Sequence, residues 1–231
     1  MATTDVNHVA LIPDGNRRWA RARGLKPWVG HQYGIESFKK ILTEALKLGV
    51  THLTVWGASR DNVEKRPLDE MRFYFKLLRK YFLELMRNIT LHKEQVRVRV
   101  IGRWEELFPA PLAAVFQKAV ETTKAYDRLH LTFLMGYDGK EEILSAIRKI
   151  KAGGETVSAA AVKRNLWTRE LPPVDLVIRT GGEPHWSSGF MMWDVADAQL
   201  YFTETLWPAF APTEFRKAVQ WAASTERRLG K

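Results

Sequence analysis

The chain contains no cysteine, which excludes disulfide bonds and thiolate chemistry. It also has no apolar run near the roughly 20 residues that a membrane-spanning helix needs. The first residues lack the basic and then apolar order of a signal peptide. Together these absences predict a soluble, cytoplasmic protein.

Internal repeats and Gly/Ser-rich linkers are absent as well, so nothing in the sequence marks a domain boundary. The length of 231 residues suits a single domain, and 45% hydrophobic residues are enough for a sizeable core. We therefore expect one domain over residues 1–231.

Acidic residues are the minority among the charged ones, with 26 Asp and Glu against 36 Lys and Arg. The resulting net charge of +10 favours anionic partners. Diphosphates, anionic lipid surfaces and nucleic acid all satisfy this condition, so charge alone does not choose among them.

The most informative stretch is residues 8–19. An apolar run, Val9 to Ile12, ends at Pro13-Asp14-Gly15-Asn16, and a basic segment with Arg17 and Arg18 follows. This order predicts a strand, a tight turn and a helix, a junction whose free N–H groups favour phosphate. A carboxylate at such a junction suits a phosphate that arrives with Mg²⁺. The alternative is that Asp14 only caps the helix.

Helical and strand-like segments alternate along the chain. Apolar residues at three- and four-residue spacing predict a helix over residues 32–47, and short apolar runs predict several strands. The predicted strands are Val9–Ile12, His52–Trp56, Val96–Ile101, Leu129–Leu134 and Val174–Ile178. This alternation predicts an α/β fold with a mostly parallel central sheet of about six strands, flanked by helices.

Residues 68–92 form the longest helical pattern, and its apolar residues occupy more than half of the circumference. A helix at the surface of a domain needs only a stripe. We therefore expect this helix to bury more than one side, either in the core or along an apolar cavity.

Three motifs carry a resemblance to a known family: Asp14-Gly15-Asn16-Arg17-Arg18-Trp19, Gly30-His31 and Arg179-Thr180-Gly181-Gly182-Glu183. In this order they resemble the cis-prenyltransferase (undecaprenyl diphosphate synthase) family over nearly the whole chain. The resemblance implies an enzyme that extends an allylic diphosphate, such as farnesyl diphosphate, with isopentenyl diphosphate. The product would be a Z-polyprenyl diphosphate for lipid-carrier synthesis.

The resemblance also implies Mg²⁺ as cofactor, a hydrophobic tunnel along the long helix, a homodimer and peripheral contact with a membrane. Asp14 would hold Mg²⁺ on the departing diphosphate, and Asn62 and Ser59 would belong to the reaction centre. The implied substrate-binding residues are Gly15, Asn16, Arg17, Arg18, Trp19, Arg23, His31, Arg66, Arg179, His185, Ser187 and Ser188.

The chain departs from the family pattern at three informative positions. Val63 stands where Trp is common, His185 replaces an Arg, and Gln199 replaces a Glu that is a metal ligand in some members. Gln199 is therefore expected to be a weak metal ligand. Because of these departures, an enzyme that couples prenyl units by irregular, head-to-middle bonds remains an alternative.

Two further alternatives remain from the sequence. A non-catalytic partner subunit is disfavoured because such relatives typically lose the Asp, and Asp14 is present. A nucleic-acid binder would need stacking aromatics on an exposed basic face, whereas most aromatics here fall at buried periodicities. We therefore expect no nucleic-acid partner.

Overall fold

The structure is a computed structural model that describes residues 5–225. Its centre is a sheet in the order β3-β4-β2-β1-β5-β6, in which all paired strands are parallel. The strands are β1 (His8–Ile12), β2 (His52–Ser59), β3 (Val96–Ile101), β4 (Leu129–Tyr137), β5 (Leu176–Arg179) and β6 (Gln199–Phe202). The predicted six-stranded parallel α/β fold is confirmed.

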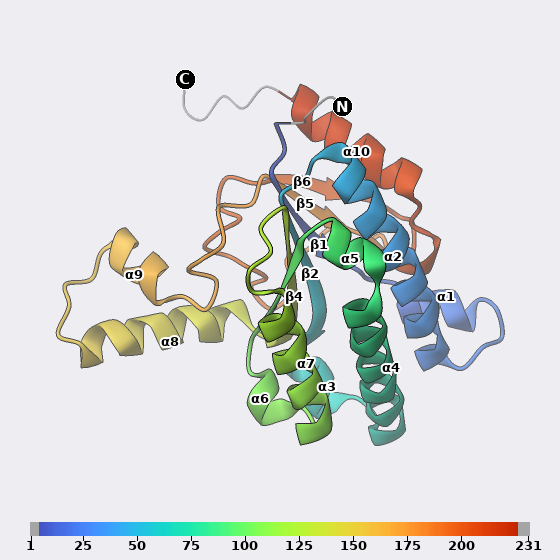
Figure 1. Cartoon of the computed structure of the whole chain (residues 1–231), viewed down its shortest axis with the longest axis horizontal. Helices are drawn as coiled ribbons and strands as arrows, with labels where there is room; N and C mark the ends of the chain where they lie inside the picture. Colours follow the sequence, from blue (N-terminus) through green and yellow to red (C-terminus); the bar gives the residue numbers. More distant parts are fainter. Residues whose placement is uncertain (1–4, 226–231) are drawn as a thin grey trace.

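Helices lie in every connection between consecutive strands from β1 to β5, whereas β5 and β6 are joined by turns and loops without a helix. The helices are α1 (Asn16–Arg21), α2 (Gly30–Leu48), α3 (Arg60–Lys65), α4 (Leu68–Arg87), α5 (Ile89–Lys93), α6 (Trp104–Leu107), α7 (Ala110–Thr123), α8 (Gly139–Ala152), α9 (Ala159–Asn165) and α10 (Pro212–Ser224), with 3-10 turns η1 (Pro27–Val29) and η2 (Trp207–Ala209). Figure 1 shows α8 and α9 extending to one side of the sheet.

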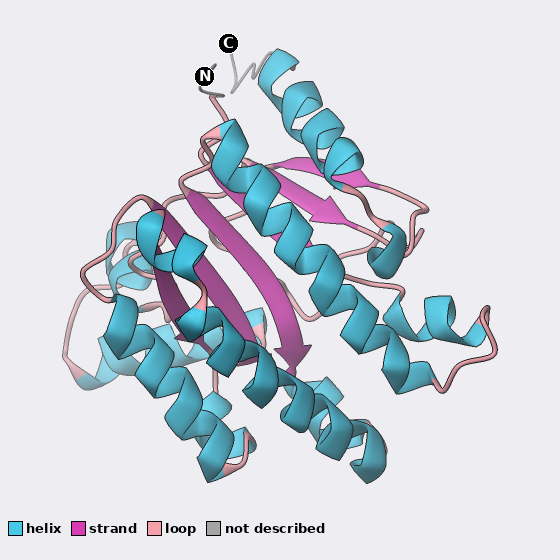
Figure 2. Cartoon of the chain, turned by 45° about the vertical axis from the view of Figure 1, so that its right-hand side comes forward, coloured by secondary structure: helices cyan, strands magenta, loops and turns pink. Residues whose placement is uncertain are grey.

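The two faces of the sheet have separate cores, because side chains alternate along each strand. Val9 and Leu11 of β1 join the large core beneath α2, α4, α7 and α10, which cover one face in Figure 2. Ala10 and Ile12 point to the other face, where they pack with Phe190 and its neighbours.

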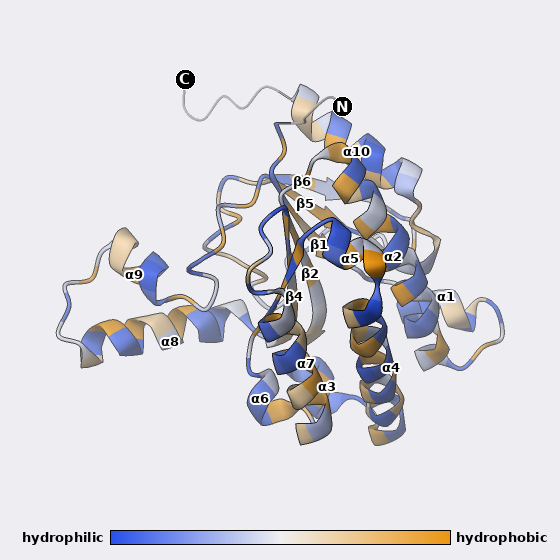
Figure 3. Cartoon of the chain, viewed as in Figure 1, coloured by the Kyte–Doolittle hydropathy of each residue, from blue (hydrophilic) through white to orange (hydrophobic). Residues whose placement is uncertain are grey.

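The long helical pattern is divided differently from the prediction. α4 ends at Arg87, and α5 is a separate short helix whose N-cap is Asn88. The Asn88 side chain accepts a hydrogen bond from the Thr90 N–H, which favours a new helix start over continuation. Figure 3 shows hydrophilic and hydrophobic residues mixed along α4. Its buried side includes Tyr74, Leu78 and Tyr81.

Parallel strands place their carboxyl ends along one edge of a sheet, where loops commonly form binding sites. Ile12 at the end of β1 pairs with Arg179 at the end of β5, and β2 ends nearby at Ser59. The loops that carry the candidate site residues therefore leave the sheet side by side. Among the described helices, none combines the length and the apolar character needed to cross a bilayer.

Candidate active site

The turn after β1 shapes the first part of the site. Gly15 has φ of 103°, a conformation that glycine adopts without strain, and it begins α1. Its N–H donates a hydrogen bond of 2.6 Å to Oδ1 of Asp14. The Asp14 side chain keeps 35% exposure, so its carboxylate is available to a ligand.

The loop after β5 closes onto the same carboxylate. Nη2 of Arg179 lies 3.1 Å from Oδ2 of Asp14, and the Thr180 hydroxyl donates to the Asp14 carbonyl at 2.8 Å. Arg179 is only 3% exposed, and its Nη1 donates to the His185 carbonyl and to Oγ of Ser187. Arg179 therefore ties the two loops together.

A basic pocket of about 290 Å³ lies beside Asp14. Its cations come from α1 and from Arg66, the C-cap of α3, and the start of α2 contributes the imidazole of His31. The lining residues are Pro13, Asp14, Gly15, Asn16, Arg17, Arg18, Arg21, His31 and Arg66. Such a concentration of guanidinium groups around a helix start suits the oxygens of a diphosphate. The structure thus brings together Arg17, Arg18, His31 and Arg66 as the sequence predicted.

Two predicted phosphate-cradle residues lie outside this pocket's lining. The guanidinium carbon of Arg23 stacks 4.0 Å from the ring centroid of Trp19, and its Nη1 donates to the Trp19 carbonyl. Trp19 is itself 9% exposed and packs against Tyr33. Arg21, one turn after Arg17 on α1, lines the pocket.

Glu70, at the start of α4, is a site residue that the sequence analysis missed. Its side chain is 1% exposed, and its carboxylate lies 3.4 Å from Nε2 of His31, 3.6 Å from Nη2 of Arg17 and 3.8 Å from Nη1 of Arg66. The Glu70 carboxylate contacts the side chains of His31, Arg17 and Arg66 and thereby fixes the positions of all three. The signal in the sequence was an acidic residue one helical turn after Arg66-Pro67.

Burial and ion pairing shift the titration of this cluster. The hydrogen bond from His31 holds the pKa of Glu70 below its usual value, so Glu70 is ionised. Burial lowers the pKa of His31, so its imidazole is neutral near pH 7 and donates one N–H to Glu70. Burial also lowers the pKa of Arg66, although that group stays charged.

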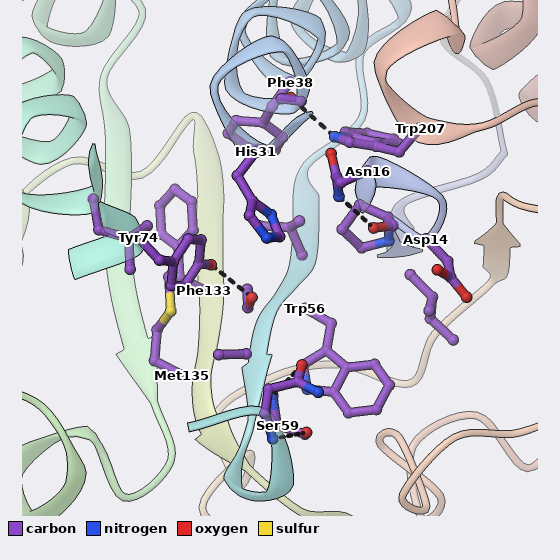
Figure 4. A pocket seen from close by; sticks show the side chains of 18 of the residues that line it. Asp14, Asn16, His31, Phe38, Trp56, Ser59, Tyr74, Phe133, Met135 and Trp207 are labelled. Carbon is purple, nitrogen blue, oxygen red and sulfur yellow. Dashed lines mark hydrogen bonds between the residues drawn. The ribbon is translucent and has the colours of Figure 1, made fainter. Parts of the chain in front are cut away.

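A cavity of about 350 Å³, lined by both apolar and polar side chains, opens next to the basic pocket, and the two share Pro13, Asp14, Asn16, His31 and Arg66. Figure 4 shows Asp14 and Asn16 on one side of this cavity and Tyr74, Phe133 and Met135 on the other. The Tyr74 hydroxyl donates to the Gly57 carbonyl at 2.6 Å, so its proton is already used within the protein. α4 contributes Tyr74, Leu78 and Tyr81 to the wall.

Ser59 and Asn62 line the same cavity and cap α3 together. Oγ of Ser59 accepts from the Asn62 N–H at 3.0 Å, and Oδ1 of Asn62 accepts from the Ser59 N–H at 3.4 Å. Ser187 and Ser188 also line the cavity. His185 lines neither the cavity nor the basic pocket; its ring contacts Glu183 and Ser187.

Gln199 lies away from this constellation within the chain. It is the first residue of β6 and pairs with Leu176, the first residue of β5. Gln199 therefore lies at the amino ends of these strands, whereas Arg179 lies at the carboxyl end of β5. Its Nε2 donates to the Thr225 carbonyl. Over residues 5–225 there is no cluster of three acidic, His or Cys side chains arranged to hold a metal ion. Asp14 fits Mg²⁺ in a different way, because this ion is often bound by one or two carboxylates together with substrate phosphates and water.

Comparison with known proteins identifies the family. The sequence profile of the undecaprenyl diphosphate synthase family matches residues 12–230. An isoprenyl transferase of Aquifex pyrophilus is 38% identical, with 97% of this chain and 95% of that protein covered. A tritrans,polycis-undecaprenyl-diphosphate synthase (geranylgeranyl-diphosphate specific) of Methanopyrus kandleri is 35% identical, with 97% and 84% covered.

Two solved structures resemble the fold closely. Lavandulyl diphosphate synthase from Lavandula x intermedia, in complex with dimethylallyl diphosphate, has a TM-score of 0.92 at 29% identity, with 98% of each chain covered. A probable undecaprenyl diphosphate synthase from Campylobacter jejuni has a TM-score of 0.82 at 26% identity, with 99% of this chain and 100% of the other covered. The chain therefore belongs to the undecaprenyl diphosphate synthase family of cis-prenyltransferases and is a prenyl transferase.

Proposed function

We propose that this enzyme transfers an allylic prenyl group from its diphosphate to isopentenyl diphosphate, with Mg²⁺, and forms a Z-configured prenyl diphosphate. The observation that carries this proposal is that a cavity with apolar side chains such as Phe38, Leu78 and Phe133 in its lining adjoins a pocket with four arginines and one carboxylate. An amphipathic substrate with a diphosphate head and a hydrocarbon tail matches both parts at once.

The reaction follows from where charge develops. The bond between the allylic carbon and the diphosphate oxygen breaks, and the diphosphate leaves with the electron pair. The double bond of isopentenyl diphosphate attacks the allylic carbon, and one proton is then lost. Fixed cations stabilise the negative charge most where it grows, so Arg17, Arg18 and Arg66 would accelerate the first step.

Asp14 would hold Mg²⁺, which when bound neutralises charge on the departing diphosphate. His31 and Arg21 would complete the contacts to this first diphosphate. Arg179 and Ser187 or Ser188 would place the second diphosphate beside it, since they border the same cavity. The proton would pass to Asn62, Ser59 or the released diphosphate.

The test is an incubation of purified enzyme with radiolabelled isopentenyl diphosphate, an allylic diphosphate and Mg²⁺. Labelled prenyl diphosphate should form, and Asp14→Ala should abolish it. Asp69→Ala is the matched control because that carboxylate is 83% exposed on α4 and does not line the cavity. Absence of product with every allylic primer, from folded protein, would contradict the proposal.

A second candidate is the irregular coupling of two allylic units. It is supported by the TM-score of 0.92 with the lavandulyl diphosphate synthase bound to dimethylallyl diphosphate. Incubation with dimethylallyl diphosphate alone distinguishes the two reactions: a branched ten-carbon product supports irregular coupling, whereas a requirement for isopentenyl diphosphate supports regular elongation.

We also propose a homodimer in the cytoplasm. The edge strand β6 exposes Leu200 and Phe202, and Trp221 of α10 is 40% exposed nearby, in ring contact with Tyr201. Edge strands with apolar side chains tend to be covered. Light scattering after gel filtration should give twice the mass of one chain, and a monomeric mass would refute the dimer.

A further inference from the structure

The proposed reaction releases one proton, and few groups in the cavity lining can accept it. Among the described residues of this lining, Asp14 and Asp61 carry the only carboxylates and His31 carries the only imidazole. Asp14 faces Nη2 of Arg179 and would hold Mg²⁺. His31 is buried, and its Nε2 contacts the Glu70 carboxylate. Asp61 is therefore the carboxylate that remains for proton transfer.

Ser59 and Asn62, the neighbours of Asp61 in the lining, are hydrogen-bonded to each other. Oγ of Ser59 accepts from the Asn62 N–H, and Oδ1 of Asn62 accepts from the Ser59 N–H. Ser59 is also only 4% exposed. A neutral hydroxyl or amide binds a proton far more weakly than a carboxylate does. The role of these two residues is therefore to cap α3 and to fix its first turn at the cavity.

The Asp61 side chain reaches both the cavity and the solvent. It lines the cavity and is 59% exposed. Nζ of Lys65, one turn further along α3, lies 2.8 Å from Oδ2 of Asp61. Within residues 5–225, the other oxygen, Oδ1, receives no hydrogen bond. The ion pair thus orients one oxygen and leaves the other available, and a proton taken up there has a path to water.

A network of ion pairs anchors α3 to its neighbours. Arg60, the first residue of α3, contacts Glu64 at 2.8 Å and Glu141 of α8 at 3.4 Å. Glu141 also pairs with Arg103, which precedes α6. Several charges joined in a network hold a geometry better than one exposed pair does. The network therefore keeps the first turn of α3, and with it Asp61, in place at the cavity.

The groups that would hold isopentenyl diphosphate line the same cavity as Asp61. They are Arg179, Ser187 and Ser188. In isopentenyl diphosphate, the carbon that loses the proton is bonded directly to the carbon that carries the diphosphate. The proton is thus released close to these groups, and a general base acts only within hydrogen-bond reach of the proton. A protein base for this step therefore has to come from the lining of this cavity.

We propose that the Asp61 carboxylate is the catalytic base that accepts the proton at the end of each condensation. This inference rests on the proposed function in its regular form. It adds a protein acceptor to those considered above and replaces Ser59 and Asn62 in that role.

The step balances as follows. When the double bond of isopentenyl diphosphate attacks the allylic carbon, positive charge develops on its tertiary carbon. The C–H bond on the adjacent carbon then breaks, its electron pair forms the new double bond, and the proton moves to Oδ1 of Asp61. A carboxylate is a sufficient base because a C–H bond beside a carbocation is strongly acidic. Exposure of Asp61 lets the proton pass to water before the next cycle.

A kinetic isotope effect tests the assignment. The substrate is isopentenyl diphosphate deuterated at the carbon that loses the proton, compared with the unlabelled compound at saturation. Asp61→Asn should lower kcat at least about a hundredfold, with little change in KM, and should show a larger isotope effect on kcat than the wild type, because proton removal becomes the slow step. An unchanged kcat, or a lower kcat with an unchanged isotope effect, would overturn the role of Asp61.

Two further variants complete the test. Asp61→Glu keeps a carboxylate and should retain more activity than Asp61→Asn; equal loss in both would overturn the proposal, including the case in which Asp61→Asn is inactive. Asp69→Asn is the matched control, an exposed aspartate that pairs with Arg72 within α4 and does not line the cavity, and should match the wild type. A wild-type enzyme that forms no product with any allylic diphosphate would contradict the proposed function itself, whereas an active wild type with an unaffected Asp61→Asn contradicts this inference alone.

Discussion

Nη2 of Arg179, at the end of β5, lies 3.1 Å from Oδ2 of Asp14, which follows β1. The two residues are 165 positions apart in the chain, but parallel pairing of Ile12 with Arg179 brings them together. The pair holds the Asp14 carboxylate at the mouth of the cavity, with its other oxygen near Arg18. A diphosphate with Mg²⁺ would therefore enter a site whose carboxylate is already oriented.

Arg179→Lys should lower kcat/KM at least about tenfold, because a lysine ammonium cannot reproduce the planar fork that contacts Asp14, Ser187 and the His185 carbonyl. Steady-state kinetics with both diphosphates would measure the effect. Arg128→Lys makes the same change at a half-exposed ion pair with Glu94 and should leave the kinetics unchanged. Equal activity of the two variants would show that the fork has no role.

Glu70→Gln should destabilise the fold by about 3 kcal/mol, because it removes one partner of a buried ionic cluster. The KM for the allylic diphosphate should also rise, since Arg17 and Arg66 lose the group that positions them. Urea unfolding and substrate titration measure these effects. Asp69→Asn, at the exposed neighbouring position, is the control and should change neither quantity.

The same carboxylate predicts a dependence of stability on pH. The pKa of Glu70 is lowered in the fold from 4.5, chiefly by the hydrogen bond from His31, so the unfolded chain takes up the proton first as pH falls. The stabilisation is thus complete above about pH 4.5 and is lost below it. Wild-type urea midpoints should fall more steeply below pH 4.5 than those of Glu70→Gln; parallel curves would argue against this assignment.

A row of histidines across the sheet predicts a second loss of stability at mildly acidic pH. His52 stacks on His130 at 4.4 Å and lies 5.6 Å from His8. Burial, followed by repulsion from His130 and His8, lowers the pKa of His52 to about 3. Because the unfolded chain binds this proton near pH 6.5, stability should decline as pH falls from 6.5 toward 3.

Between pH 7 and pH 5, the free energy of unfolding should fall by about 1 kcal/mol less in His52→Gln than in the wild type. This figure allows for solvent screening at a half-exposed site. Chemical denaturation between pH 7 and pH 5 would measure the difference.

Gly181→Ala should lower stability and weaken diphosphate binding together. Gly181 has φ of +95°, and a Cβ there would lie 2.6 Å from Nη2 of Arg18. The backbone strain is about 1 to 2 kcal/mol, and the displaced guanidinium should raise the dissociation constant for diphosphate severalfold. Gly24→Ala separates these effects, since Gly24 has φ of +68° with no atom within 4 Å of the added Cβ. A loss of affinity in Gly24→Ala as large as in Gly181→Ala would contradict the steric explanation.

Local patterns predicted most of the fold, because five of the six strands coincide with short apolar or alternating segments and the long helices have three- and four-residue spacing. β6 (Gln199–Phe202) was not predicted, because it is short and half-exposed. β3 was predicted with the bounds that the structure shows. The predicted end of this helix, at residue 92, was wrong because Asn88 caps a new helix although the apolar pattern continues past it. The closing Arg227-Arg228-Leu229-Gly230 segment, which resembles the family's C-terminal motif, lies outside the described residues.

The sequence by itself determined the parallel α/β class, and the family resemblance assigned Asp14 and Arg179 to one active site. The α/β class follows from residue types and from the geometry of parallel strands. Only the tertiary structure placed Glu70 among Arg17, His31 and Arg66, brought Arg21 into the pocket lining, and gathered the rings of Phe38, Tyr81 and Phe133 in the cavity lining. These features depend on how α1, α2, α4 and β4 pack against one another, and the local sequence does not specify which of its residues meet across such long-range contacts.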